Sequence, residues 1–490
     1  MSTNGKQDRA TLQRIARIAM LARGLLPDFS TQALAELDRI QAPITNGDGQ
    51  LRDLRQLLWA SIDNDDSCDL DQLSVAEALP EDRIKVLVAV ADVDAAVKKD
   101  TALDEHARHN TTSVYTAAKI FSMLPERLST DLTSLGFQAD RAAIVIEMRI
   151  APDGSLLGSD IYRAYVRNRA KLAYNSVAAW LAGAAAPAAV AAVPGLDENL
   201  RLQDRAARRM KNLRQSHGAL SFETLQARPL FDGDAIRELR VEETNCAKDL
   251  IADFMIAANG VTARYLSAKQ FPALRRVVRT PKRWDRIVEI AGQHGCTLPG
   301  EPDSRALNDF LVQQKAADPL RFPDLSLAVI KLMGPGQYVA DCPGDGAPGG
   351  HFGLAVGDYT HSTAPNRRYP DIITQRLLKA SLGGQAAPYD KKELETLADH
   401  CTQQEDAAKK VERQVEKSAA AILLQSSIGR QYDAIVTGAA AKGTWVRLFH
   451  PPVEGKLVEG VQGIDVGQKI RVQLLHTDVE HGFIDFKRLD

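Results

Sequence analysis

The 490-residue chain has few cysteines, and nothing in their spacing joins them into a framework. Its five cysteines are scattered, and none stands in a Cys-x-x-Cys pair. This argues against a disulfide scaffold or a cysteine-rich zinc site and indicates a reducing compartment. The chain also lacks net charge, since 61 Lys and Arg against 63 Asp and Glu give −2. The overall charge therefore singles out neither nucleic acid nor an anionic membrane as a partner.

Long hydrophobic runs are missing as well. Residues 15–26 are interrupted by Arg17 and Arg23, and residues 182–193 are mostly alanine with Pro187 among them. Neither segment is apolar enough for a signal peptide or a membrane span. We therefore expect a cytoplasmic protein without a membrane partner, in which residues 182–193 form a surface connection.

The sequence contains no common cofactor motif. It has no His-Glu-x-x-His pair, no Walker loop and no dinucleotide fingerprint, so it predicts no nucleotide cofactor. His351 is interpreted as structural.

The composition is that of a globular protein, with 44% hydrophobic and 25% charged residues and length for about three domains. Apolar residues at helical spacing in 12–22, and a second helix from Thr31 with Ser30 as its N-cap, predict a helical unit over residues 1–55. Two interpretations stay open for this unit: a helix-turn-helix-like module, or a helical cap on the next domain.

The central part of the chain mixes strands and helices irregularly. Apolar patterns predict strands at 84–91 and 143–150, and Asp153-Gly154 predicts a hairpin turn after the second. Helical stretches dominate from 171 to 311. Further helices are expected at 366–382 and 391–427. The absence of a βαβ rhythm favours an α+β fold for residues 56–428.

The last sixty residues change texture again. Short strands are predicted at 432–436, 445–448, 469–474 and 483–486, separated by turn residues. This spacing is typical of a small β-barrel, here residues 429–490.

The densest chemical signal is an acidic loop at residues 61–72, with aspartates at 63, 65, 66, 69 and 71. Aspartates this close repel one another unless a cation neutralises them, and oxygen ligands suit Mg²⁺ or Mn²⁺. A calcium loop does not fit, because Cys68 stands where glycine is needed and Ser74 where a bidentate glutamate is needed. A metal site and a solvated acidic loop both remain open.

A second signal runs from His351 to Asp371. Pro365 and Pro370 predict a helix start there, which places Arg367 and Arg368 where backbone N–H groups already favour an anion. Two exposed arginines in solvent would be the ordinary explanation. Beside an acidic metal loop, however, a phosphate clamp is favoured.

Four motifs together resemble the catalytic domain of the ribonuclease II and ribonuclease R family. They are the acidic loop, residues 112–125, residues 169–174 and residues 351–371, and they occur in the family's order across 57–385. The final barrel resembles the RNA-binding OB-fold that usually ends these enzymes. The N-terminal helical unit occupies the place of the family's two cold-shock barrels, as in a shorter bacterial variant.

The resemblance implies an activity. The chain is expected to be a monomeric, Mg²⁺-dependent, processive 3′→5′ exoribonuclease that degrades single-stranded RNA to nucleoside 5′-monophosphates. The alternative is an RNA-binding or scaffold protein that keeps the fold without efficient catalysis. Gln72 keeps this alternative open, because the family usually has a further aspartate there.

The resemblance also implies roles for residues at the reaction centre. Asp63, Asp69 and Asp71 match metal-binding and catalytic aspartates, and Gln72 is a further, uncharged metal ligand. The remaining matches are Arg367 and Arg368, which correspond to residues that hold the scissile phosphate.

Substrate contacts follow from the same resemblance. Tyr115 matches the aromatic residue that stacks on the terminal base, with Phe222 on the other face of that base. Tyr174 matches a contact to the ribose, and Asp253 stands where the family has a glutamate on the same sugar.

Basic and aromatic residues elsewhere could extend the RNA path. In the barrel, Trp445 beside Lys442 and Arg447 suits base stacking, although a barrel-core tryptophan is the alternative. The stretches 205–211 and 275–279 could line the path or form solvated helix faces.

Overall fold

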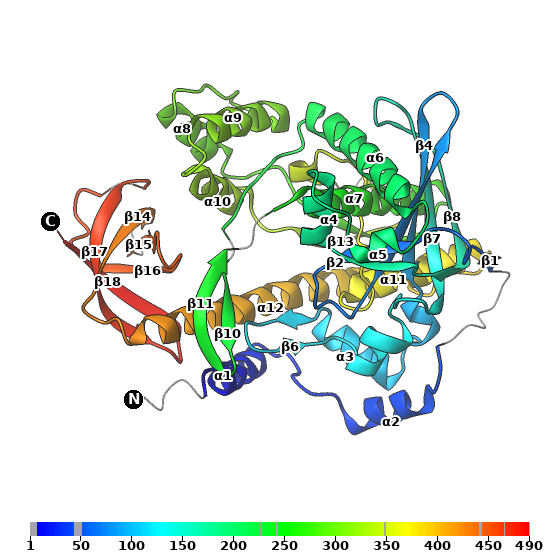
Figure 1. Cartoon of the computed structure of the whole chain (residues 1–490), viewed down its shortest axis with the longest axis horizontal. Coiled ribbons are helices and arrows are strands. Elements are labelled where there is room, and N and C mark those ends of the chain that lie inside the picture. Colours follow the sequence, from blue (N-terminus) through cyan, green and yellow to red (C-terminus); the bar gives the residue numbers. More distant parts are fainter. Residues whose placement is uncertain are drawn as a thin grey trace.

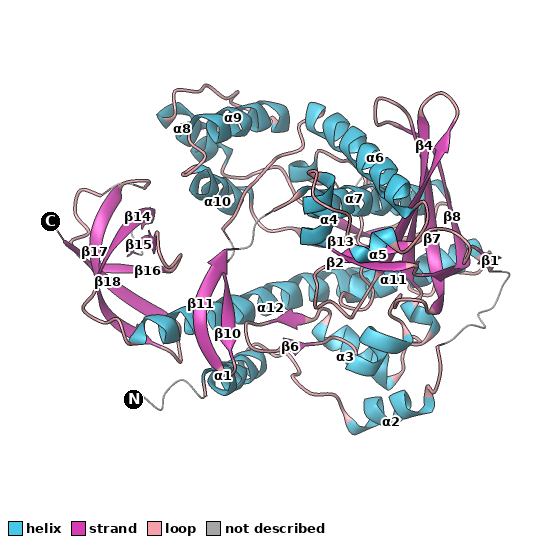
Figure 2. Ribbon diagram, in the orientation of Figure 1, coloured by secondary structure: helices cyan, strands magenta, loops and turns pink. Residues whose placement is uncertain are grey.

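The computed structural model describes residues 7–43, 51–225, 227–241, 244–346, 349–440, 443–464 and 466–489. A mixed sheet lies toward one end of the molecule, a closed barrel lies at the other, and the long helix α12 (Lys391–Gln425) runs between them (Figure 1). Helices and strands alternate irregularly, which confirms the α+β class (Figure 2).

The central sheet has seven strands in the order β1-β8-β7-β4-β3-β2-β9. The β1–β8 and β2–β9 pairs are parallel and the other pairs are antiparallel. The strands are β1 (Arg52–Asp53), β2 (Ala60–Asp63), β3 (Gln72–Leu79), β4 (Arg83–Ala91), β7 (Asp140–Ile150), β8 (Leu156–Arg167) and β9 (Ala170–Ala173). The predicted strands at 84–91 and 143–150 are β4 and β7. The predicted turn at Asp153-Gly154 joins β7 to β8 in a hairpin.

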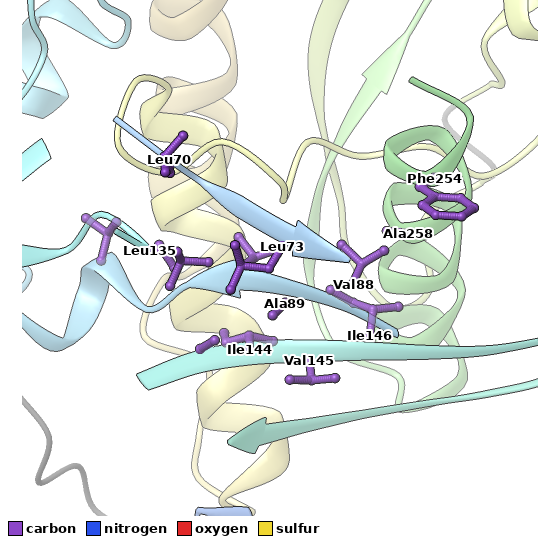
Figure 3. Packing of buried hydrophobic residues seen from close by; sticks show 14 of the residues in the cluster. Leu70, Leu73, Val88, Ala89, Leu135, Ile144, Val145, Ile146, Phe254 and Ala258 are labelled. Carbon is purple, nitrogen blue, oxygen red and sulfur yellow. The ribbon is translucent and has the colours of Figure 1, made fainter. Parts of the chain in front are cut away.

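The main core lies around β3, β4 and β7. Val88 and Ala89 of β4 are fully buried because the strand sits between two neighbours and is covered by helices. Phe254 and Ala258 pack into the same cluster from helix α7 (Cys246–Ala268) (Figure 3). A continuous apolar run such as 84–91 therefore folds as a central strand, with few polar positions to satisfy.

Helices surround this sheet and extend toward the barrel. Besides α7 and α12 they are α1 (Asp8–Ala22), α2 (Thr31–Arg39), α3 (Ala102–Asn110), α4 (Tyr174–Leu181), α5 (Ala188–Ala191), α6 (Leu196–Ser216), α8 (Trp284–Gln293), α9 (Ser304–Ala317), α10 (Phe322–Met333) and α11 (Tyr369–Leu382). None of the helices in the described ranges has the length and apolar character needed to cross a bilayer.

The two N-terminal helices pack on different partners. Helix α1 packs on α12, whereas α2, N-capped by the Ser30 hydroxyl, packs on α3. Their buried residues belong to separate clusters, since Leu12 joins the α12 cluster and Leu37 joins the main core. This arrangement favours the helical-cap interpretation of the segment.

The C-terminal barrel closes in the order β14-β15-β16-β18-β17. Its strands are β14 (Gln431–Ala440), β15 (Gly443–Leu448), β16 (Glu454–Glu459), β17 (Lys469–Asp478) and β18 (Phe483–Leu489). Four of them match the predicted segments, and β16 is an additional strand. The end of α12 plugs the barrel, because Ala421 and Leu424 belong to its core cluster.

Several local expectations differ from the structure. Within the stretch expected to be mainly helical lie the hairpin β10 (Ala227–Asp232) and β11 (Ala235–Val241) and the strand β12 (Ala273–Val277), which pairs with β13 (Gln337–Asp341). Helix α11 begins at Tyr369 rather than near residue 366, with Pro370 in its first turn. The expected surface connection 182–193 contains helix α5, whose Val190 is buried.

Candidate functional site

The acidic loop is the connection between two neighbouring strands. β2 ends at Asp63 and β3 begins at Gln72, so the aspartates leave the sheet at one edge. The Ser134 hydroxyl fixes the loop, since it donates to the Cys68 carbonyl (2.8 Å) and accepts from the Leu70 N–H (3.0 Å). The loop is therefore a held segment of the fold rather than a free, solvated charge run.

Asp71 is the most buried aspartate of the loop, with 2% of its surface exposed. The Asn366 N–H donates to its Oδ1 (2.9 Å), and Arg367 Nε lies 3.4 Å from its Oδ2. The structure thus joins the acidic loop to the basic motif, although 295 residues separate Asp71 from Asn366.

The charge of Asp71 is not fully compensated by these partners. Burial raises the pKa of Asp71 to about 7, although Arg367 and the Asn366 N–H act in the opposite direction. Burial also raises the pKa of Asp63, with the charge of Asp69 adding to the effect. The raised pKa values show that negative charge on these carboxyl groups is unfavourable without a further cation. A bound cation would stabilise that charge, and oxygen donors suit a hard divalent metal.

The described residues hold no ready-made cage of metal ligands. Within the described ranges, no group of three or more His, Cys, Asp or Glu side chains is arranged to hold a metal ion. The four-ligand set predicted from Asp63, Asp69, Asp71 and Gln72 is therefore not preassembled. Mg²⁺ is commonly held by one or two carboxylates together with waters and substrate phosphates, and such a site needs no dedicated cage.

Arg367 and Arg368 have different environments. The Arg367 side chain is 42% exposed and lies on the acidic loop side, next to Asp71. Arg368 donates from Nη2 to Oδ1 of Asp371 (2.8 Å), a carboxylate that is fully buried. Asp371 holds Arg368 while Arg367 stays open to an anion, so the two guanidinium groups of the expected clamp have different surroundings. The clamp itself stays a prediction.

Tyr115 faces the acidic loop from β5 (Val114–Tyr115), which forms a two-stranded hairpin with β6 (Ile120–Phe121). Its hydroxyl lies 3.4 Å from Asp69 Oδ2, and its side chain remains partly exposed. Burial of the hydroxyl end raises the pKa of Tyr115, while the Arg367 charge opposes the rise. The phenol therefore stays protonated beside the carboxylate.

Tyr174 lies at the same edge of the sheet. β9 pairs in parallel with β2, which sets Ala173 opposite Asp63 and brings Tyr174, the first residue of α4, next to that carboxylate. Burial and the charge of Asp63 raise the pKa of Tyr174. Six of the predicted residues thus gather at one place: Asp63, Asp69, Asp71, Tyr115, Tyr174 and Arg367.

Two predicted substrate contacts lie elsewhere. Asp253 of α7 is buried and ion-paired with Arg214 of α6, at a pocket that lies between these two helices. Phe222 packs, partly buried, on the cluster formed by α8, α9 and α10. Neither contact joins the acidic cluster, and both roles stay predictions.

In the barrel, Trp445 lies outside the core. Along β15 the residues at 444, 446 and 448 are buried, so Trp445 and Arg447 occupy the outward face. The indole covers Gly438 and Gly443, where any side chain would meet it. The barrel-core alternative is therefore wrong. Arg447 is engaged by Asp324 of α10 (2.6 Å), and Lys442 lies outside the described residues.

The basic stretches have structural partners. Arg275 and Arg276 are buried in β12 and paired with Asp341 and Glu405, so they are neither an RNA-lining surface nor a solvated helix face. In the stretch 205–211, Arg209 pairs with Asp82.

His351 agrees with its structural interpretation. Its Nδ1 accepts from the Leu354 N–H (3.2 Å), and burial lowers the pKa of its ring to about 4.

Sequence reasoning missed three residues that support the site. They are Asn366, whose backbone binds Asp71; Asp371, which holds Arg368; and Glu412 of α12, which accepts from the Tyr115 N–H (2.8 Å). Only Asp371 carries a local signal, since it follows Arg368 by three residues at a helix start.

Comparisons with known proteins identify relatives of this chain. The family model for the RNB domain matches residues 51–384, and the model for the RNase II-type exonuclease C-terminal S1 domain matches residues 430–489. The chain is 32% identical over 415 residues to Ribonuclease R of Aquifex aeolicus, covering 82% of this chain and 57% of that protein. It is 30% identical over 433 residues to Ribonuclease R of Escherichia coli, covering 82% and 50%. The chain thus spans about half the length of these relatives.

Solved structures show the same fold. RNase R of Mycoplasma genitalium in complex with ribose-methylated single-stranded RNA superposes with a TM-score of 0.87 at 20% identity, covering 98% of this chain and 78% of that one. The same protein with double-stranded RNA gives 0.84 at 21% identity, covering 98% and 83%.

Proposed function

This chain belongs to the RNB-domain family, and on that premise we propose that it is a processive exoribonuclease that hydrolyses single-stranded RNA from the 3′ end to nucleoside 5′-monophosphates. The observation that carries the proposal is the meeting of buried Asp71 with half-exposed Arg367 across 3.4 Å. Asp71 supplies negative charge that its partners compensate only in part, and Arg367 supplies positive charge open to an anion. Together they form a centre at which a phosphodiester and a cation would each be stabilised.

The chain's own residues divide the work. Arg367, free on one side, binds a non-bridging oxygen of the scissile phosphate and stabilises the charge that develops there. Asp371 pairs with Arg368, the neighbour of Arg367 in the chain, and the Asn366 N–H holds the Asp71 carboxylate in one orientation. These contacts position the charged groups before substrate arrives.

Nucleases of this family generally depend on a metal ion. We assign Mg²⁺, with Mn²⁺ as a substitute, to Asp63, Asp69 and Asp71, with Gln72 as an uncharged ligand. When bound, the ion would supply an activated water and charge relief at the reacting oxygens. The support is the all-oxygen donor set and the raised pKa of the Asp71 carboxyl.

Binding of the RNA end would use aromatic residues. The partly exposed ring of Tyr115 beside Asp69 suits stacking on the terminal base, with Phe222 proposed for the other face. Tyr174, next to Asp63, suits the ribose, and Asp253 is proposed for the same sugar. Stacking accepts every base, and contact with the 2′-OH distinguishes RNA from DNA. We further propose a monomer that acts in the cytoplasm without a nucleotide cofactor.

The test is a time course on a 5′-labelled single-stranded RNA, first with Mg²⁺ and then with EDTA. We expect a short 5′ end product to accumulate with few intermediates in Mg²⁺, and intact RNA in EDTA. Intact RNA with every divalent metal, together with a clear gel shift, would replace the proposal with the RNA-binding alternative.

A further inference from the structure

The hairpin that carries Tyr115 is too small to hold its own position. Its strands β5 and β6 contribute two residues each. An isolated hairpin of this size is not stable in water, so its place depends on what it packs against. Where Tyr115 lies relative to Asp69 is therefore decided by the neighbours of the hairpin.

Helix α1 backs this hairpin. Leu12 and Ala16 of α1 are fully buried in one cluster with Val114 and Phe121 of the hairpin. Gln13 Nε2 also donates to the Ala118 carbonyl in the turn between β5 and β6, at 3.4 Å. The helix thus shares a buried cluster with the strands of the hairpin and contacts its turn through Gln13.

Helix α12 completes the support. Val411 and Val415 belong to the same cluster, and Glu412, between them, accepts the Tyr115 N–H. The hairpin is consequently held between α1 and α12. Both helices lie outside residues 51–384, the segment that matches the RNB domain.

The two faces of α1 differ in a way that can be tested. Leu12 faces the cluster with no exposed surface, whereas Ile18 and Leu21 are each 54% exposed. A 15-residue helix is marginal alone in water, so its order comes from the packed face. A substitution on the packed face changes the support of the hairpin, whereas the same substitution on the exposed face changes only the helix propensity of α1. Comparing the two separates these effects.

We propose that α1 is a positioning element of the RNA 3′-end site, in which Leu12 and Gln13 hold the β5–β6 hairpin so that Tyr115 can stack on the terminal base. This inference rests on the proposed function for the identity of its ligand. Neither Leu12 nor Gln13 is assigned a contact with RNA or with the reacting atoms. Their effect passes through Tyr115, and it vanishes when Tyr115 is absent.

The experiment measures stacking directly. An RNA oligonucleotide ending in 3′-terminal 2-aminopurine is titrated with the protein in Mg²⁺, in an Asp71→Asn background that keeps the RNA intact, and the quenching of its fluorescence is recorded. The variants are Leu12→Ala, Gln13→Ala and Tyr115→Ala, with Ile18→Ala as the matched control on the exposed face. Leu12→Ala is also combined with Tyr115→Ala, and circular-dichroism melting identifies any variant that fails to fold. Gln13→Ala removes no core side chain and keeps the test decisive if Leu12→Ala unfolds.

We expect Leu12→Ala and Gln13→Ala to reduce quenching by about twofold or more, and Ile18→Ala to leave it unchanged. In the Tyr115→Ala variant, Leu12→Ala should cause no further loss of quenching. Three outcomes would overturn the inference. The first is equal quenching in Gln13→Ala and Ile18→Ala, and the second is that Leu12→Ala reduces quenching equally with and without Tyr115. The third is no quenching in the parent. If the unmutated chain fails to hydrolyse RNA while the expected quenching pattern appears, the proposed function is wrong and the positioning role of α1 stands.

Discussion

Asp71 is a carboxylate that the fold buries without fully neutralising it. Replacing it with asparagine keeps the shape and leaves an amide oxygen for the Asn366 N–H, but removes the charge that a cation requires. We expect Asp71→Asn to lower the rate of RNA hydrolysis at least about a hundredfold, while the Kd for RNA stays within about threefold. The measurement is single-turnover hydrolysis in Mg²⁺ alongside fluorescence anisotropy.

Asp65 provides the matched control for this prediction. It lies in the same loop, two residues from Asp63, but its side chain is exposed. Asp65→Asn removes the same charge from the loop and should retain the parent rate. Full activity of Asp71→Asn, or an equal loss in both variants, would contradict the central role of Asp71.

The sequence identifies these acidic and basic residues but not how each is held. Asp71 and Arg367 stand in dense motifs, so their chemistry is visible locally. The partners that set the geometry of the site are distant in the sequence. Glu412, for example, lies 297 residues from Tyr115, whose N–H it accepts. Arg368 shows the opposite problem, because its motif suggests a phosphate ligand while Asp371 has already engaged it.

At the scale of elements, buried charges fix helix α11 to helix α3 and to the turn that follows β4. Arg376 is 4% exposed and pairs with Asp94 (2.8 Å) and Asp104 (2.7 Å). Replacing it with methionine would leave these carboxylates buried with fewer partners, and removing one member of a buried pair typically costs about 3–5 kcal/mol. We expect Arg376→Met to lower the free energy of unfolding by roughly that amount, measured by urea unfolding with circular dichroism.

Lys392→Met tests whether the loss depends on burial. Lys392 is an exposed cation in the first turn of α12, so its substitution should change the free energy of unfolding by less than about 0.5 kcal/mol. An Arg376→Met variant as stable as Lys392→Met would mean that the buried pairs contribute no net stability.

Elements differ in how far the sequence predicts them. The strands β4 and β7 and the helix α12 carry long, regular apolar patterns and were predicted close to their observed bounds. The hairpin β10–β11 was missed because it has no buried residue to create such a pattern. β12 was misread because its buried Arg275 and Arg276 are paired with residues 66 and 129 positions away.

At the scale of the whole molecule, buried histidines make stability depend on pH. Burial lowers the pKa of His106 to about 4, against about 6.5 in an unfolded chain. Between these values the unfolded state binds more protons, so stability falls as the pH drops from 6.5 toward 4. For one such histidine the loss between pH 7 and pH 5 is about 2 kcal/mol.

We therefore expect His106→Gln to make the free energy of unfolding less dependent on pH between 7 and 5, whatever its effect at pH 7. The measurement is urea unfolding at several pH values. His476→Gln, at an exposed position in the barrel, should keep the slope of the parent. A slope in His106→Gln equal to that of the parent would show that His106 does not titrate on unfolding.

The barrel and the sheet lie toward opposite ends of the molecule (Figure 1), and the Arg447–Asp324 ion pair ties the barrel to α10. We therefore expect only a long RNA to contact both. Trp445 lies on the outward face of the barrel, where its ring can stack on a base. Stacking contributes about 1–3 kcal/mol per base, so Trp445→Ala should weaken binding of a 30-nucleotide RNA by roughly 5- to 150-fold. Binding of a tetranucleotide, which we expect to contact only the catalytic site, should not change. Phe483→Ala, at another exposed barrel aromatic, is the control. Fluorescence anisotropy with both RNAs decides, and an equal loss for the two lengths would place the effect of Trp445 on the fold instead of on the RNA path.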